Sequence, residues 1–256
     1  MATNATLKMI RITGYIALLL ASSTLLAANP THRVDYQGFT IWLDCKEHAA
    51  FKFRYNAGHD MGDSPRTDDF RLDPTVPYEC QPSSFYSFST KNTPGAPTYH
   101  RGHLVAANHL DYSEQAIRES FFMTNILPMT QQLNLGAWGS TEKITECYRD
   151  QSELLILGGA IWGDKKKDRV NDYFVGSHNI RTPEYFWKVI IKGDGETIAW
   201  LIPNNQTANA ANLDKYLVKP SQIQVRAKVK LPEVPKAWRN KRPMTSWLLP
   251  EGCQPS

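Results

Sequence analysis

The sequence predicts an α+β domain with a mixed, mainly antiparallel central sheet flanked by helices. Strand-like segments rich in aromatic and β-branched residues are mixed irregularly with short helical segments. No internal repeat is visible, and no linker is long enough to force two domains. A chain of 256 residues with 41% hydrophobic residues can bury one ordinary core.

The first residues have the pattern of a secretory signal peptide. Lys8 and Arg11 precede an apolar run that ends near Leu26, and small residues follow. We expect a signal peptide over residues 1–28, followed by a single domain over residues 29–256. An uncleaved anchor is the alternative, but the run is short for a membrane-spanning helix. Cleavage predicts a secreted or periplasmic protein with no stable membrane association.

Cysteine usage agrees with export. No CxxC spacing is present, which argues against a structural zinc site. An even number of cysteines in an exported chain predicts two disulfides, and three pairings are open. We favour Cys45–Cys80, which would close a loop in the N-terminal half, and Cys147–Cys253, which would fix the C-terminal tail.

In the N-terminal half, alternation of apolar and polar side chains predicts strands. The expected segments are strands at 36–43 and 50–55, a polar stretch at 56–97 with a short strand at 85–88, and an extended segment at 99–106.

In the C-terminal half, Ser113 followed by Glu114 predicts the start of a short helix. Gly193-Asp194-Gly195 predicts a hairpin turn. The expected segments are a helix at 113–122, an irregular loop at 123–133, a helix at 134–149, strands at 154–162, 185–192 and 196–202, a short helix at 211–217, and a Pro-rich surface tail beyond 232.

The extended segment carries a candidate reaction centre. Hydrolysis of a phosphodiester needs a base for water and a cation on the phosphoryl oxygens. The unperturbed pKa of a histidine side chain permits His103 to act as a base near neutrality. Arg101, two residues earlier in an extended chain, projects to the same face and can bind a phosphate in bidentate fashion. Gly102 between them would allow a close backbone approach or an unusual φ.

Asn134 and Glu142 are candidates for holding a cation. The amide oxygen of Asn134 suits Mg²⁺, and Mn²⁺ or Ca²⁺ would fit the same site. Eight residues of helix separate Glu142 from Asn134 by about 12 Å and roughly 80° of rotation. This spacing predicts that Asn134 binds the metal directly and that Glu142 acts through a water.

Together these stretches resemble a known family. HRGHLVAANH (100–109), FFMTNILPM (121–129) and QQLNLGAWGSTE (131–142) are similar to the motifs of the DNA/RNA non-specific endonucleases, which include secreted bacterial nucleases and endonuclease G. The resemblance implies a ββα-metal (His-Me finger) site. It implies His103 as general base, Asn134 as metal ligand, Glu142 as the water-holding carboxylate and Arg101 as a phosphate contact. It also implies in-line attack that leaves a 5′-phosphate and a 3′-hydroxyl.

Two positions need comment beside this resemblance. The family has a further phosphate-binding arginine in an upstream loop, for which Arg66 is the better match and Arg71 the rival. His100 stands where the family has Asp, which changes the charge beside Arg101. We expect His100→Asp to retain activity and mainly to shift its pH dependence.

Charge indicates how a substrate would be held. The net charge is +4, and Lys165, Lys166 and Lys167 form one basic run while residues 219–242 form another. Contact with phosphate backbones is one interpretation and a solvated surface is the other. No base-reading motif is visible, which favours both DNA and RNA as substrates. A homodimer is also compatible with the sequence.

Two other functions share these residues. One is a phosphodiesterase that acts on small nucleotides. The other is a nuclease-like module that binds nucleic acid with little or no catalysis. A Ser-His-Asp hydrolase is disfavoured, because the sequence contains no G-x-S-x-G motif.

Overall fold

The structure is a computed structural model that describes residues 1, 31–163 and 171–254. At its centre lies a six-stranded sheet of order β1-β2-β3-β6-β7-β8, in which every neighbouring pair is antiparallel. Its strands are β1 (Thr31–Tyr36), β2 (Phe39–Asp44), β3 (Ala49–Ala57), β6 (Leu154–Ile161), β7 (Tyr185–Lys192) and β8 (Thr197–Pro203). The predicted α+β class with a mainly antiparallel sheet is confirmed.

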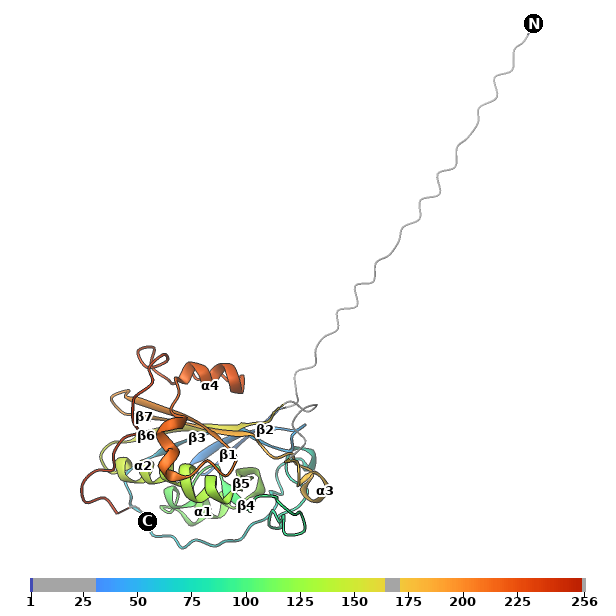
Figure 1. Cartoon of the computed structure of the whole chain (residues 1–256), viewed down its shortest axis with the longest axis horizontal. Coiled ribbons are helices and arrows are strands. Elements are labelled where there is room, and N and C mark those ends of the chain that lie inside the picture. The colour runs from blue at the N-terminus through green and yellow to red at the C-terminus, as the bar shows by residue number, and fades with distance from the viewer. Residues whose placement is uncertain (2–30, 164–170, 255–256) are drawn as a thin grey trace.

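A second, two-stranded sheet pairs β4 (Tyr99–His103) with β5 (Ile126–Thr130). The α-helices are α1 (Glu114–Ser120), α2 (Gly139–Arg149), α3 (Val175–His178) and α4 (Pro220–Ala227). Shorter helical turns are η1 (Tyr78–Cys80), η2 (Ala107–His109), η3 (Met123–Asn125), η4 (Leu133–Trp138) and η5 (Ala210–Tyr216). In Figure 1, α1, α2 and the β4–β5 pair lie on one face of the large sheet, and α4 lies on the other.

Both faces of the large sheet are covered by apolar side chains, because neighbouring residues of a strand point to opposite faces. Ile156 and Ile190 belong to the core that includes Trp138, next to α2. Leu157 and Val189 belong to a second core that includes Ile223 of α4. The sheet therefore separates the α2 side of the molecule from the α4 side.

Several expected elements are confirmed. These are the strands of the large sheet at 36–43, 50–55, 154–162, 185–192 and 196–202, within a few residues at their ends, and the helices at 113–122 and 211–217. Ser113 caps α1, where its hydroxyl accepts a hydrogen bond from the backbone N–H of Ala116 at 3.4 Å. That contact satisfies one of the free N–H groups of the first helical turn.

Two expectations were wrong, and three elements were missed. The segment 123–133 is no irregular loop, since it contains β5. Residues 85–88 form no strand. The strand β1 and the helices α3 and α4 were not expected at all.

The helix expected over 134–149 is interrupted. Gly136, inside the π-helical turn η4, has φ −102° and ψ −105°, which is not helical, so the chain kinks between Asn134 and the start of α2. A Cβ on Gly136 would lie 2.8 Å from the Cα of Asn209, so only glycine allows the two backbones to approach this closely. The separation of about 12 Å and roughly 80° that a continuous helix would place between Asn134 and Glu142 therefore does not apply.

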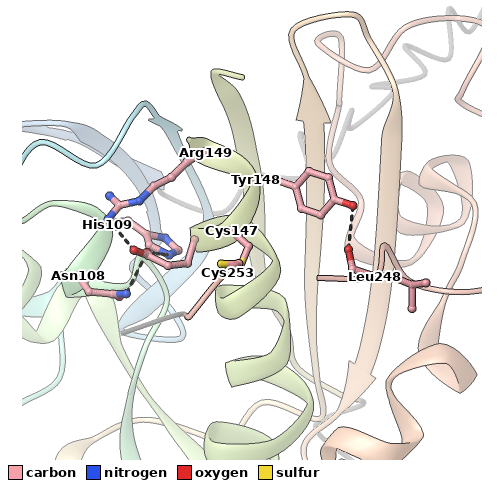
Figure 2. The surroundings of a disulfide bond; sticks show 8 residues. Asn108, His109, Cys147, Tyr148, Arg149, Leu248 and Cys253 are labelled. Carbon is pink, nitrogen blue, oxygen red and sulfur yellow. Dashed lines mark hydrogen bonds and ion pairs between the residues drawn. A yellow bond between two sulfur atoms is a disulfide. The ribbon is translucent and has the colours of Figure 1, made fainter. Parts of the chain in front are cut away.

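Both favoured disulfides are present. Cys45–Cys80 joins the residue after β2 to η1, and Cys147–Cys253 joins α2 to the C-terminal tail. Figure 2 shows the second bond beside a further attachment of the tail, in which the hydroxyl of Tyr148 donates to the carbonyl of Leu248 at 2.9 Å. The tail is thus held to α2 at two points.

Two predictions fall outside this description. The signal peptide over residues 1–28, except Met1, and the basic run Lys165–Lys167 lie outside the described residues. Among the residues that are described, no helix combines the length and apolar character needed to cross a bilayer.

Candidate active site

The β4–β5 pair places Arg101 and His103 on one face. Arg101 is paired with Pro128 and His103 with Ile126, and alternation along β4 directs both side chains the same way. Gly102 between them has no positive φ. A Cβ there would lie 2.4 Å from Cγ of Met129, so the glycine makes room for the Met129 side chain. Of the two reasons expected for Gly102, close approach is the one the structure supports.

His103 lies in a mostly apolar environment at the base of the site. Its ring centroid is 5.6 Å from that of Phe70 and 4.8 Å from that of Phe121, and only 8% of the residue is exposed. Burial, followed by the positive charge of Arg66, lowers the pKa of His103 to about 3. The imidazole is therefore neutral at pH 7, which is the form that accepts a proton.

The backbone around His103 is held by two buried side chains. Trp138 Nε1 donates to the carbonyl of His103 at 3.0 Å. Asn125 donates to the carbonyl of Val105 and accepts from its N–H, both at 3.0 Å. These contacts fix the chain as it leaves β4, and they explain the Asn and Trp of the two downstream motifs in structural terms.

Asn134, in η4, faces His100 across the site. Its Nδ2 lies 3.3 Å from Nδ1 of His100, so a neutral His100 with a free Nδ1 lone pair accepts a hydrogen bond from the amide. This contact orients the amide nitrogen toward β4 and leaves the Oδ1 of Asn134 as the atom available to a hard cation.

That contact sharpens the expectation for His100→Asp. A carboxylate can accept the same hydrogen bond from Asn134, so activity is expected to persist. An imidazole accepts it only when neutral, so the two proteins should differ in pH dependence. The measurement is a pH–rate profile on plasmid DNA for both proteins. Complete loss of turnover in the variant would show instead that His100 is itself catalytic.

The predicted site residues line one pocket of about 340 Å³. Its lining includes five residues singled out from sequence, Arg66, Arg101, His103, Asn134 and Glu142, together with Asn108, Leu135, Lys143 and Glu146. They come from the loop before η1, from β4, from η2, from η4 and from α2. Segments separated by more than seventy residues of sequence thus meet in one place.

The two rival arginines are placed differently. Arg66 lines the pocket, with its guanidinium carbon 5.2 Å from the ring centroid of Phe121. Arg71 is not among the lining residues, and its guanidinium donates instead to Asp69 and to the carbonyl of Arg118. The geometry favours Arg66 as the second phosphate contact.

Lys188 was missed by sequence reasoning. It lies in the apolar strand β7, is fully buried, and its Nζ has no hydrogen-bond partner among the described residues. The ammonium lies 3.8 Å from the ring centroid of Trp138. Burial lowers the pKa of Lys188 to about 8, and the nearby Glu142 carboxylate opposes that shift. A lone lysine in the apolar run YFWKVII was the signal in the sequence.

Glu142 depends on this charge. Burial raises the pKa of Glu142, and the positive charge of Lys188 is the largest influence in the opposite direction, followed by His109. Lys188 therefore helps to keep the carboxylate ionised at the edge of the pocket.

Replacing Lys188 with methionine tests this dependence. Loss of the buried charge raises the pKa of Glu142 further, so the acid limb of the pH–rate profile is expected to move to higher pH. Activity should fall most at the acid end of the profile and recover as the pH rises. Lys188→Arg, which keeps the charge, is the matched control. An unchanged acid limb in the methionine variant, with folding verified by circular dichroism, would contradict the dependence.

The basic segment 219–242 is not part of this pocket. Its first part packs on the α4 face of the sheet through Ile223, Val229 and Leu231. Asn134 and Glu142 of the pocket come from η4 and α2, and α2 lies on the face of the sheet opposite α4 (Figure 1). A strand bound at His103 would therefore not meet the first part of this segment at the same time.

The oxygen ligands of the pocket suit a divalent cation that keeps several waters better than a cation whose ligands all come from the protein. No group of three His, Cys, Asp or Glu side chains able to hold a metal occurs within the described part of the chain. The pocket offers Oδ1 of Asn134 and the carboxylate of Glu142. It also contains Asn108 and Glu146, but the Glu146 carboxylate accepts hydrogen bonds from Asn108 Nδ2 at 3.2 Å and from Arg149 at 2.8 Å. Mg²⁺ usually keeps several waters and binds few protein ligands, which suits this arrangement.

A pair of antiparallel strands followed by a helix, with a histidine on the first strand and an asparagine just before the helix, is the arrangement of the ββα-metal class of fold. Comparison with known families agrees. The model of the DNA/RNA non-specific endonuclease family matches residues 22–234, and the chain therefore belongs to that family.

Individual relatives support the same conclusion. Human mitochondrial endonuclease G is 27% identical over 173 residues, covering 64% of this chain and 56% of the relative. Mitochondrial nuclease 1 of Schizosaccharomyces pombe is 29% identical over 146 residues, covering 50% and 44%. The chain thus spans about half the length of the curated relatives it matches. A solved structure of EndoG with EndoGI superposes with a TM-score of 0.61 at 18% identity, covering 82% of this chain and 89% of that one.

Proposed function

We propose that the protein is a divalent-metal-dependent endonuclease that hydrolyses phosphodiester bonds of DNA and RNA without strong sequence specificity. One observation carries the proposal: a neutral histidine, an oriented asparagine, a carboxylate and two arginines line a single pocket. Membership of the DNA/RNA non-specific endonuclease family supports it.

His103 acts as the general base. Its Nε2 is buried without a hydrogen-bond partner among the described residues, so Nδ1 is the nitrogen that takes a proton from water. The water oxygen attacks phosphorus in line with the scissile bond, and the bond from phosphorus to O3′ breaks. The leaving O3′ takes up a proton from a water molecule, so the products are a 5′-phosphate and a 3′-hydroxyl.

The remaining residues position the phosphate and stabilise charge. Arg101 and Arg66 bind its non-bridging oxygens. Asn134 would hold Mg²⁺, or Mn²⁺ or Ca²⁺ in its place, directly, and Glu142 would act through a water. When bound, the cation stabilises negative charge on the phosphate and the leaving oxygen.

We further propose that the protein acts outside the cytosol. Two disulfides are typical of secreted or periplasmic proteins, and the N-terminal pattern of a signal peptide agrees. The curated relatives compared above are mitochondrial proteins. Mass spectrometry of the protein from culture medium or periplasm, with Asn29 as the first residue, would support this localisation.

The experiment that tests the activity uses purified protein with supercoiled plasmid and with RNA, in Mg²⁺ and in chelator. Nicking of plasmid and degradation of RNA in Mg²⁺ alone are expected. A small chromogenic phosphodiester serves as a third substrate. Turnover of that diester without nicking would indicate a phosphodiesterase of small nucleotides, and tight binding without any cleavage would indicate a binding module.

A further inference from the structure

Two exposed aromatic residues lie in a segment without regular secondary structure whose backbone is bound by the pocket residue Arg101. Phe85 is 42% exposed and Tyr86 is 70% exposed. Their ring centroids are 4.9 Å apart with an interplanar angle of 33°. Exposed neighbouring aromatic rings cost free energy in water unless something covers them.

The backbone that carries these rings is fixed on both sides. Arg101 Nη1 donates to the carbonyl of Phe85 at 3.1 Å, and Nε2 of His178 lies 3.0 Å from the carbonyl of Tyr86. His178 is itself buried, and its carbonyl accepts from the N–H of Ser83 at 2.8 Å. The backbone that carries the rings is therefore already ordered. A ligand that contacts them loses little binding free energy to the ordering of this segment.

Arg101 connects the aromatic pair to the reaction centre. The same guanidinium lies 3.7 Å from the ring centroid of Phe70, whose ring contacts His103. It also lines the pocket. A phosphate held by Arg101 is thus one residue contact away from the backbone that carries the aromatic pair. A cationic phosphate contact beside aromatic rings is the combination by which proteins bind single-stranded nucleic acid.

We propose that Phe85 and Tyr86 form a stacking subsite for an unpaired nucleobase next to the scissile phosphate. This inference rests on the proposed function. Any nucleobase presents a ring face, so the subsite accepts DNA and RNA of any sequence. In a duplex the bases are already stacked and paired on one another. The subsite therefore makes single-stranded nucleic acid the preferred substrate class.

A binding measurement tests the subsite without turnover. The probes are a fluorescent 20-mer of thymidylate and a 20-mer of abasic deoxyribose phosphate, which has the same charge and no bases. Binding is measured by anisotropy in chelator with the disulfide-bonded protein. The wild type is expected to bind the thymidylate strand more tightly, and Phe85→Ala with Tyr86→Ala should remove about 5- to 100-fold of that preference. Affinity for the abasic strand should not change.

Cleavage in Mg²⁺ provides the second arm. The alanine variants should raise KM for a single strand and leave KM for a blunt duplex of the same length nearly unchanged. Phe85→Tyr and Tyr86→Phe should behave as the wild type. Tyr78→Ala, at an aromatic residue of η1 that is 63% exposed, is the control. Equal losses on single strand and duplex, or an unchanged preference for bases in chelator, would overturn the subsite. Absence of cleavage by the wild type would instead contradict the proposed function. The stacking subsite would then be tested by the anisotropy measurement in chelator alone.

Discussion

Replacing His103 with alanine is expected to lower kcat on supercoiled DNA by about 10²- to 10⁴-fold, the usual contribution of a positioned general base. Affinity for nucleic acid should change little, because Arg66 and Arg101 remain in the pocket. Since the pKa of His103 is lowered to about 3, the residue stays neutral throughout the usual assay range. The acid limb of the wild-type profile is then expected to follow Glu142, whose pKa burial raises.

The measurement is single-turnover cleavage together with equilibrium binding in chelator. His59→Ala is the matched control, because His59 is exposed and pairs with Asp150 away from the pocket lining. Its rate should equal that of the wild type. A His103 variant that keeps its rate, or one that loses affinity as much as rate, would contradict the role of general base.

Removal of the Cys147–Cys253 disulfide is expected to destabilise the protein strongly. The bond closes a loop of 106 residues, for which chain entropy predicts about 4.8 kcal/mol of stabilisation. For a domain of this size, such a loss would lower Tm by roughly 10–19 °C. The variant Cys147→Ala with Cys253→Ala tests this by thermal unfolding. Because Cys147 directly follows Glu146 on the helix that carries Glu142, catalysis should become heat-sensitive over the same range.

The second disulfide supplies the comparison. Cys45–Cys80 has a sequence separation of 35, for which the same reasoning gives about 3.8 kcal/mol. Its double alanine variant should therefore lose somewhat less stability. An unaltered Tm after loss of Cys147–Cys253 would show that the contacts of the tail, such as Tyr148 with Leu248, hold it without the bond.

The sequence predicted five of the six strands of the large sheet, from alternation of apolar and polar residues near the N-terminus and from apolar runs further on, but it revealed neither β1 nor β5. The segment ILPMT contains Pro128, which removes a backbone donor and lowers any strand prediction. In the structure β5 belongs to a sheet of only two strands, where Pro128 opposite Arg101 is tolerated. At 85–88 the opposite error arose, because alternating aromatic residues suggested a strand. In the structure the carbonyls of Phe85 and Tyr86 contact the side chains of Arg101 and His178 instead of a neighbouring strand.

The site was predictable where it depends on local periodicity. Arg101 and His103 lie two residues apart on one strand, so their common face follows from the sequence. The relation of Asn134 to Glu142 did not follow, because Gly136 breaks the helix through a contact with residues 208–210, distant in sequence. Lys188 was not predictable as part of the site, since its proximity to Glu142 arises from packing of α2 on the sheet.

The central claim is that one cation binds at Asn134 beside His103. An anomalous-scattering map from crystals soaked in Mn²⁺ tests it directly. We expect a single peak within bonding distance of Asn134 Oδ1, in the pocket lined by His103, with Glu142 reaching it through a water. A peak bonded directly to Glu142 would contradict the water-mediated role, and a peak on the opposite face of the sheet, or none at Asn134, would contradict the account as a whole.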